Sequence, residues 1–215
     1  MKTAVQWLEI LISCGVKAGT AARWAGAFST EVLESNFSLG AAEIDDFVAT
    51  CLHESALLEK MAENLNYSTE ALIAKFGRHR ISIEDAQRYG RNNDHPADQP
   101  MIANCLYGGK WGLDNLGNIE PEDGWDYRGS GVGGLTGRAN FRLVEKATGL
   151  PLEANPDLVR RPGAEALQVF IAWWEKRIPD AVIGNVPMTR RKVNGGDFGL
   201  AHVTALTDQL GDALA

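Results

Sequence analysis

The 215-residue sequence predicts a mainly α protein with a single domain, and three observations carry that prediction. Apolar residues recur at helical spacing in several windows along the chain. Two serines stand directly before such windows, where their side chains can cap the first turn of a helix. No internal repeat, low-complexity tract or linker divides the chain, so residues 1–215 are expected to share one core.

The N-terminal segment 4–16 predicts an amphipathic helix rather than an export signal. Glu9 interrupts its apolar run, and no small-residue cleavage pattern follows. The residues that align at helical spacing are Val5, Leu8, Ile12 and Val16. Because the chain contains no run of 18 apolar residues, no membrane span is expected.

A second helix is predicted over 43–51, and it leads to a candidate catalytic residue. Its apolar positions are Ile44, Phe47, Val48 and Cys51. Glu54 follows about one turn later, near the end of a helix expected to be buried. Apolar surroundings would raise the pKa of the Glu54 carboxyl and keep it protonated, as a general acid requires.

Glu63 lies nine residues after Glu54 and opens the polar stretch Glu-Asn-Leu-Asn-Tyr-Ser. That stretch predicts an irregular loop or a short hairpin, which would leave Glu63 more solvated than Glu54. A neutral carboxyl beside an ionised one is the arrangement that glycoside hydrolysis uses. With 28 acidic residues in the chain, the pair alone is weak support, since most charged side chains are solvated.

Helical signals continue through the rest of the chain. Ser68 is placed to cap a helix over 69–76, and Ser82 to cap one over 83–89. Polar loops are predicted over 91–100 and 114–123, and further helices over 101–107, 164–176 and 200–214. In the helix at 164–176, the residues predicted to form one buried stripe are Leu167, Phe170, Ile171 and Trp174. Trp173 points away from that stripe and is expected to pack rather than stack on a ligand.

The stretch 124–141 contains six glycines together with Trp125, Tyr127, Thr136 and Asn140. It predicts a strand-like segment lining a cleft, because glycines allow close backbone approach and the other side chains supply aromatic and polar groups. A glycine-rich surface turn is the plain alternative. The glycines at 129–134 also fit a dinucleotide-binding pattern, but no βαβ context surrounds them.

Four motifs occur together and in a fixed order. They are His53-Glu54-Ser55, Glu63 through Ser68, Tyr127-Arg128-Gly129 through Phe141, and Asn194-Gly195-Gly196. In this order they resemble glycoside hydrolase family 19, the chitinase-like part of the lysozyme-like superfamily, and most of all its short bacteriophage endolysins. The resemblance runs from about residue 20 to about residue 205. It implies a two-lobed fold with a small β-hairpin or short sheet beside the cleft.

The resemblance also implies an inverting mechanism without metal or organic cofactor. By that likeness Glu54 is the general acid, Glu63 is the general base, and Thr136 holds the attacking water. Asn140, Asn194 and Tyr127 are the expected substrate-binding residues. An inverting site keeps its two carboxyl groups about 6.5–9.5 Å apart so that water fits between them.

The expected substrate is peptidoglycan, cut at a β-1,4 bond between N-acetylated sugars, or a chitin-like polymer. An endolysin would be made in the host cytoplasm without a signal peptide and would act in the periplasm after release by a separate factor. A monomer without a separate wall-binding domain is expected. The named residues do not separate peptidoglycan from chitin.

The chain departs from the family pattern at Ser130 and Gly134, where relatives carry Arg and Gln. The first change removes a cation that could pair with a carboxylate, and the second removes a substrate contact. These changes keep a non-catalytic sugar-binding protein open as an alternative. A secreted antibacterial effector with the same activity and a lytic transglycosylase with a single catalytic acid also remain open.

Charge and cysteine content exclude several other classes. The formal net charge of −7, with no compensating basic face, argues against a nucleic-acid partner. The three cysteines, Cys14, Cys51 and Cys105, match no zinc spacing and are expected to be reduced. Leu57 stands where a zinc protease would have its second histidine, so His53 is not expected to bind metal. His79, His95 and His202 are expected at the surface.

Overall fold

The computed structural model describes residues 1–214 and confirms a mainly helical protein. Short 3-10 turns join some of the helices, and the one that matters below is η2 (Gly40–Glu43). The α-helices are α1 (Ala4–Ser13), α2 (Ala18–Glu31), α3 (Ile44–Glu54), α4 (Thr69–Lys75), α5 (Ile83–Tyr89), α6 (Gln99–Tyr107), α7 (Gly109–Leu116), α8 (Asp123–Asp126), α9 (Arg138–Thr148), α10 (Ala164–Arg177), α11 (Val186–Asn194) and α12 (Leu200–Leu214).

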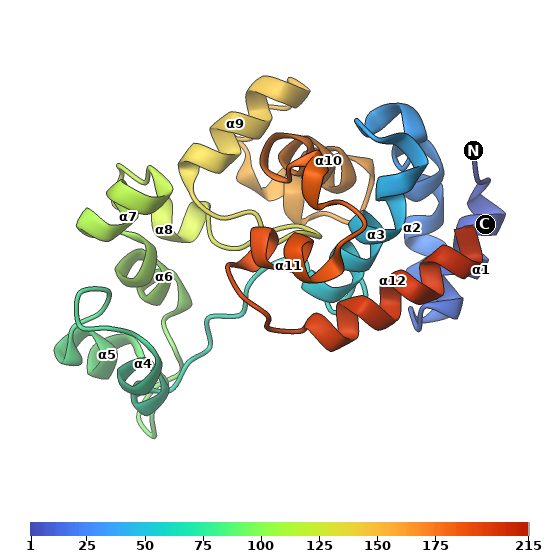
Figure 1. The fold of residues 1–215 in the computed structure, drawn as a ribbon. Coiled ribbons are helices and arrows are strands. Elements are labelled where there is room, and N and C mark those ends of the chain that lie inside the picture. Colours follow the sequence, from blue (N-terminus) through green and yellow to red (C-terminus); the bar gives the residue numbers. More distant parts are fainter. Residues whose placement is uncertain (215) are drawn as a thin grey trace.

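The helices form two groups, as Figure 1 shows. The larger group contains α1–α3 and α10–α12, in which α12 packs on α3 and α1 packs on α2. The smaller group contains α4–α7, and the chain crosses to it through the irregular segment 55–68. Helices α8 and α9 lie between the two groups, since α8 packs on α6 and α9 packs on α10.

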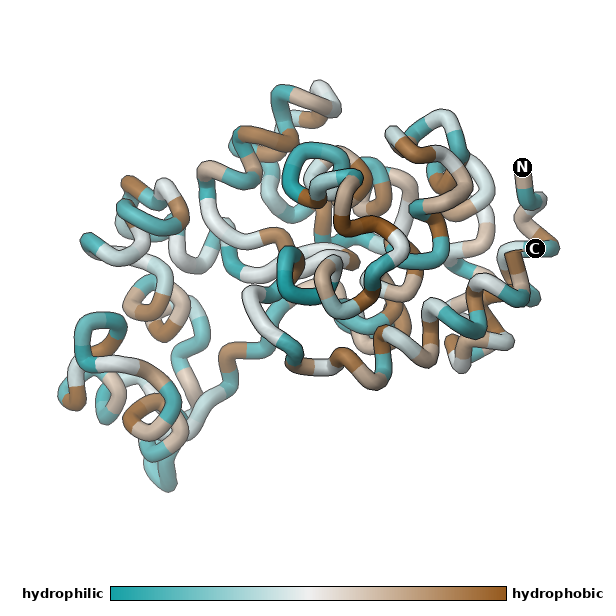
Figure 2. The backbone as a smooth tube through the Cα atoms, in the orientation of Figure 1, coloured by the Kyte–Doolittle hydropathy of each residue, from teal (hydrophilic) through white to brown (hydrophobic). Residues whose placement is uncertain are grey.

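Each group buries its own hydrophobic cluster, and hydrophobic segments occur throughout both in Figure 2. The larger cluster is rich in aromatic rings, with Phe47 stacked on Phe170 and edge-on to Trp174. The smaller cluster is formed by Leu65, Leu72, Ile81, Ala86, Ile102, Ala103 and Leu106. A third cluster around Phe141 and Val169 fills the space between α9 and α10. Trp173 stacks on Phe170 at 5.5 Å, which confirms its packing role.

The predicted caps and several predicted helices are confirmed. Ser68 Oγ accepts from Ala71 N at 3.2 Å, and Ser82 Oγ accepts from Asp85 N at 2.9 Å. Helix α12 has the predicted bounds. The four residues of the predicted stripe in α10 are all buried.

The buried face of α1 is not the predicted one. Val5 and Ile12 are 66% and 43% exposed, whereas Trp7, Ile10 and Leu11 are buried. Because α1 carries apolar residues on nearly all sides, the spacing of these residues alone does not identify the face that α2 and α12 cover.

The predicted strand at 124–141 is also absent from the described residues. Its first part forms α8, its last part begins α9, and the expected hairpin is reduced to single bridges joining Ser130 to Ala62 and to Leu135. Gly131 and Gly134 have φ values of 74° and 66°, which interrupt an extended conformation. A Cβ at Gly133 would lie 1.9 Å from the Phe170 ring, so glycine lets this loop approach α10.

Candidate active site

Glu54 is the last residue of α3, where a side-chain cap ends the helix. Ser55 Oγ donates to Cys51 O at 2.6 Å and accepts from Leu58 N at 2.8 Å. The next three residues, Ala56, Leu57 and Leu58, all have positive φ between 50° and 65° and turn the chain sharply. This left-handed turn, Ala56–Leu58, leaves the Glu54 side chain at the surface of a cleft, 24% exposed.

Arg190 forms an ion pair with Glu54 through Nη1 and Oε1. The arginine comes from α11, and only 2% of its side chain is exposed. Its Nε also donates to Phe198 O at 2.8 Å. The apolar surroundings predicted for Glu54 are therefore wrong, because a buried guanidinium faces the carboxylate.

Glu63 lies within the irregular segment 55–68 and is held by both its backbone and its side chain. Its N–H donates to Gly129 O at 2.8 Å, which joins it to the glycine-rich loop. The Tyr107 hydroxyl lies 2.7 Å from each of the two carboxylate oxygens. Burial and the charge of Glu63 raise the pKa of Tyr107, so the phenol keeps its proton and remains a donor to Glu63.

The two glutamates line one cleft of about 470 Å³. Lys60, Tyr107, Gly134 and Thr136 contribute to the same lining. Thr136 Oγ1 donates to Gly134 O at 2.8 Å, and the hydroxyl lies 3.5 Å from the position a Cβ at Gly129 would take. Glycine at position 129 thus leaves room between Glu63 and Thr136.

The other predicted substrate-binding residues lie outside this lining. Tyr127 is 2% exposed, and its hydroxyl donates to Glu153 O at 3.0 Å, so the ring belongs to the core. Asn140 donates to Thr136 O at 2.8 Å and accepts from Arg177 Nη2 at 2.9 Å. Asn194 donates to Phe198 O at 3.1 Å and accepts from Gly196 N at 2.9 Å. Both asparagines therefore shape loops beside the site.

The two departures from the family pattern differ in their structural effect. Ser130 is 1% exposed, and its Oγ donates to Arg128 O and accepts from Arg160 Nε at 2.9 Å. Arg160 thus brings a cation to the hydroxyl of Ser130. Gly134 is exposed at the cleft, and nothing lies within 4 Å of its missing Cβ. A larger side chain at position 134 would meet open space, although the positive φ of Gly134 disfavours any residue other than glycine.

His53 contacts His202 across α3 and α12, with the two Nδ1 atoms 2.9 Å apart. Burial lowers the pKa of His53, and the charges of Arg190 and His202 lower it further. Within residues 1–214, no cluster of three or more His, Cys, Asp or Glu could hold a metal ion. The cysteines are free, as predicted, with Cys14 and Cys51 buried and Cys105 half-buried.

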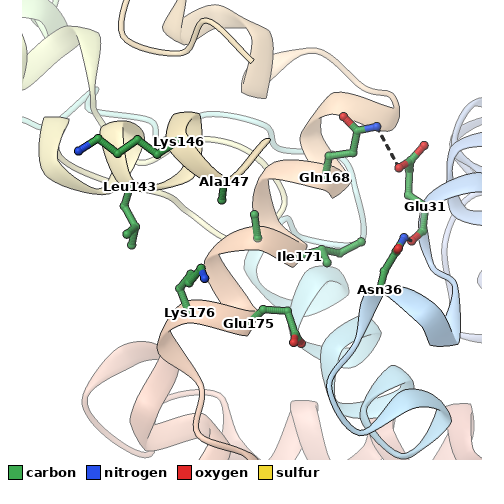
Figure 3. A pocket seen from close by; sticks show the side chains of 10 residues that line it. Glu31, Asn36, Leu143, Lys146, Ala147, Gln168, Ile171, Glu175 and Lys176 are labelled. Carbon is green, nitrogen blue, oxygen red and sulfur yellow. Dashed lines mark hydrogen bonds between the residues drawn. The ribbon is translucent and has the colours of Figure 1, made fainter. Parts of the chain in front are cut away.

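A larger groove of about 630 Å³ lies between α9, α10 and the end of α2, as Figure 3 shows. Gln168 donates to Glu31 across it at 3.0 Å, and Lys146 and Lys176 lie at its sides. None of the residues identified from the motifs lines this groove. The smaller cleft is therefore the candidate active site.

Comparison with known proteins decides the family. No family model matches the chain. A glycosyl hydrolase family 19 domain-containing protein of Haemophilus influenzae is 33% identical over 155 residues, which cover 72% of this chain and 71% of that protein. The chain belongs to glycoside hydrolase family 19. Two Arabidopsis thaliana endochitinases are 32% and 34% identical over 76 and 74 residues, about a third of this chain and about a quarter of each endochitinase.

Membership makes this protein a glycoside hydrolase of chitinase-like type, as the motifs predicted. Two partners of the catalytic glutamates carry no signal in the sequence. Tyr107 stands at the end of a predicted helix, and Arg190 is one of three consecutive basic residues on α11. Only the folded chain brings them to the two carboxylates, because they lie 44 and 136 residues away along the sequence.

Proposed function

We propose that this family 19 hydrolase is an endolysin-type enzyme that cleaves β-1,4 bonds between N-acetylated sugars of peptidoglycan with inversion. The observation that carries the proposal is the pair of glutamates in one cleft, each held by a different partner. Glu63 accepts hydrogen bonds from a phenol and is free to take a proton from water. Glu54 stands at the end of a rigid helix, where it can reach a glycosidic oxygen.

In the proposed reaction, Glu54 donates a proton to the glycosidic oxygen as the bond to the anomeric carbon breaks. Glu63 removes a proton from a water that attacks the same carbon from the opposite face, and Thr136 orients that water. Arg190 stabilises the carboxylate that Glu54 becomes after it has donated its proton. The products are a new reducing end of inverted configuration and a free hydroxyl on the leaving sugar.

The endolysin role also includes action in the periplasm, after synthesis in the host cytoplasm and release by a separate factor. Within residues 1–214, no helix has both the length and the apolar character needed to cross a membrane.

The test is digestion of purified Gram-negative peptidoglycan by the wild type, Glu54→Gln and Glu63→Gln, with mass spectrometry of the products. Hydrolysed reducing ends that disappear in both variants are expected. Glu59→Gln is the matched control, because Glu59 lies between the two in sequence but accepts from Thr20 outside the cleft. Anhydro-sugar ends with activity retained in Glu63→Gln would instead identify a lytic transglycosylase.

A chitinase is the second candidate, favoured by the similarity to two plant endochitinases. Assays of chitin oligomers and peptidoglycan in parallel distinguish the two functions, because the ratio of the two kcat/KM values shows which substrate the enzyme prefers. Tight binding of both polymers without any product would contradict the enzyme assignment and leave a sugar-binding protein.

A further inference from the structure

Phe198 is the most exposed aromatic side chain in the described part of the chain, at 83%. It lies in the loop 195–199 between α11 and α12. A single exposed apolar residue is common on protein surfaces and needs no function by itself. The position and rigidity of this loop distinguish Phe198 from the other exposed apolar residues.

The loop 195–199 is fastened to the catalytic acid from two sides. The carbonyl of Phe198 accepts from Arg190 Nε at 2.8 Å, and the same guanidinium pairs with Glu54. At Gly199, a Cβ would lie 2.2 Å from the His53 ring, so the backbone packs directly on the residue before Glu54. The loop therefore keeps a fixed position relative to the acid.

Two further contacts stiffen the loop 195–199 from inside. Asn194 Nδ2 donates to the same Phe198 carbonyl at 3.1 Å. Arg191 forms two hydrogen bonds with Asp197, at 2.7 and 3.0 Å. With two side chains hydrogen-bonded to the Phe198 carbonyl, the loop presents an uncovered phenyl ring from a defined position. Figure 1 places this loop on the side of the larger helix group that faces the smaller one.

We propose that Phe198 is a sugar-stacking residue beside the cleft, on the loop that Arg190 connects to Glu54, and this role rests on the proposed function. Its ring would take the C–H face of a pyranose unit of the glycan strand, on the side of the cleft where Glu54 donates its proton. A flat aromatic face matches the C–H face of a pyranose, because the ring face is electron-rich and the C–H hydrogens carry partial positive charge. The rigid loop means that little conformational entropy is lost when the sugar binds.

The first experiment measures binding of a long glycan oligomer in the Glu63→Gln background, which leaves Arg190, Glu54 and the loop intact. Phe198→Ala is expected to raise Kd about 2- to 10-fold, the range of an aromatic contact. Phe198→Trp should restore wild-type affinity, whereas Phe198→Leu should not, because leucine keeps apolar area but has no ring face. Full recovery by leucine would overturn the stacking role.

The second experiment uses steady-state kinetics in the wild-type background. Phe198→Ala should raise KM for oligomers with little change in kcat, and should leave Tm unchanged because the ring is exposed. Ile119→Ala is the matched control, since Ile119 is 60% exposed and lies between α7 and α8 rather than in the loop 195–199. A KM equal to the wild-type value in Phe198→Ala would contradict the inference.

The two proposals fail in distinguishable ways. If the wild type cleaves peptidoglycan and Phe198→Ala binds and cleaves normally, only the stacking role is lost. If the wild type cleaves neither peptidoglycan nor chitin and Glu63→Gln binds neither, both the proposed function and the role of Phe198 are overturned.

Discussion

At the scale of single residues, each carboxylate of the cleft has one partner that sequence spacing could not supply. Tyr107 donates to Glu63, and Arg190 pairs with Glu54. Both partners act through the glutamates, so they are positioning residues. Replacing either one tests how far the two carboxylates depend on their neighbours.

Replacing Tyr107 with Phe removes the hydrogen bond to both oxygens of Glu63 while keeping the ring. A hydrogen bond to a charged group is worth about 1.5–3 kcal/mol, so kcat should fall roughly 10- to 100-fold with a smaller change in KM. Initial rates on peptidoglycan or chitin oligomers measure the loss. Tyr89→Phe, on α5 of the same helix group, is the control and should match the wild type.

Replacing Arg190 with Met should lower both activity and stability. The Glu54 carboxylate loses its buried cation, and kcat should fall about 100-fold. The free energy of unfolding should fall by about 2–3 kcal/mol, less than for a fully buried pair because Glu54 is 24% exposed. Arg191→Met is the control, since Arg191 is exposed and pairs with the exposed Asp197. Equal losses in both variants, in kinetics and urea unfolding, would contradict the special position of Arg190.

At the scale of elements, α10 and η2 meet through a pair of acidic side chains. Glu43 is 2% exposed, and its carboxylate accepts from Trp174 Nε1 at 2.9 Å and from Leu39 N at 2.6 Å. Glu175 lies beside it, and burial together with the charge of Glu43 raises the pKa of the Glu175 carboxyl. The two helical elements are therefore joined best when Glu175 is protonated.

This pair predicts a pH dependence of stability. Because the pKa of Glu175 is higher in the folded state than in the unfolded chain, its stabilising contribution is complete below the unfolded value, about 4.3, and is lost as pH rises through the folded value. Glu175→Gln should remove this contribution to the pH dependence of the free energy of unfolding. Urea unfolding of the wild type and of Glu175→Gln between pH 4 and about 8 measures the difference. Glu165→Gln, at an exposed site of the same helix, should keep the wild-type slope.

Local signals were sufficient for much of the secondary structure. Ser68 and Ser82 cap the helices that their positions predicted, because a capping hydrogen bond spans only three residues. The buried face of α1 and the folding of segment 124–141 were predicted wrongly, because both depend on contacts with distant elements. Among the site residues, the motifs led to a cleft that contains Glu54, Glu63 and Thr136, whereas Tyr127 belongs to the core.

At the scale of the whole molecule, the protein consists of two helix groups and carries a formal net charge of −7. A negatively charged protein and an anionic cell-wall polymer repel each other. Salt screens this repulsion, and the screening length is about 8 Å at physiological ionic strength. Short-range contacts inside the cleft must therefore supply the recognition. This balance separates the two candidate substrates by their response to salt.

Raising the ionic strength from about 0.01 to 0.15 M should lower KM for peptidoglycan, because screening weakens the repulsion between like charges. The KM for uncharged chitin oligomers should stay constant over the same range. Parallel Michaelis–Menten series on the two substrates provide the measurement. A KM for peptidoglycan that rises with salt would show that local cations, such as Lys60 in the cleft, outweigh the overall charge.

The left-handed turn Ala56–Leu58 also limits how this sequence can vary. Branching at Cβ makes positive φ especially costly, so Val, Ile and Thr should be depleted at these three positions in a library selected for folding. Gly and Asn should be enriched at Ala56, which is exposed and has no core contact to lose. The turn after Glu54 would then be recognisable in a set of folded variants from the residues that these positions accept, without a substrate or an activity assay.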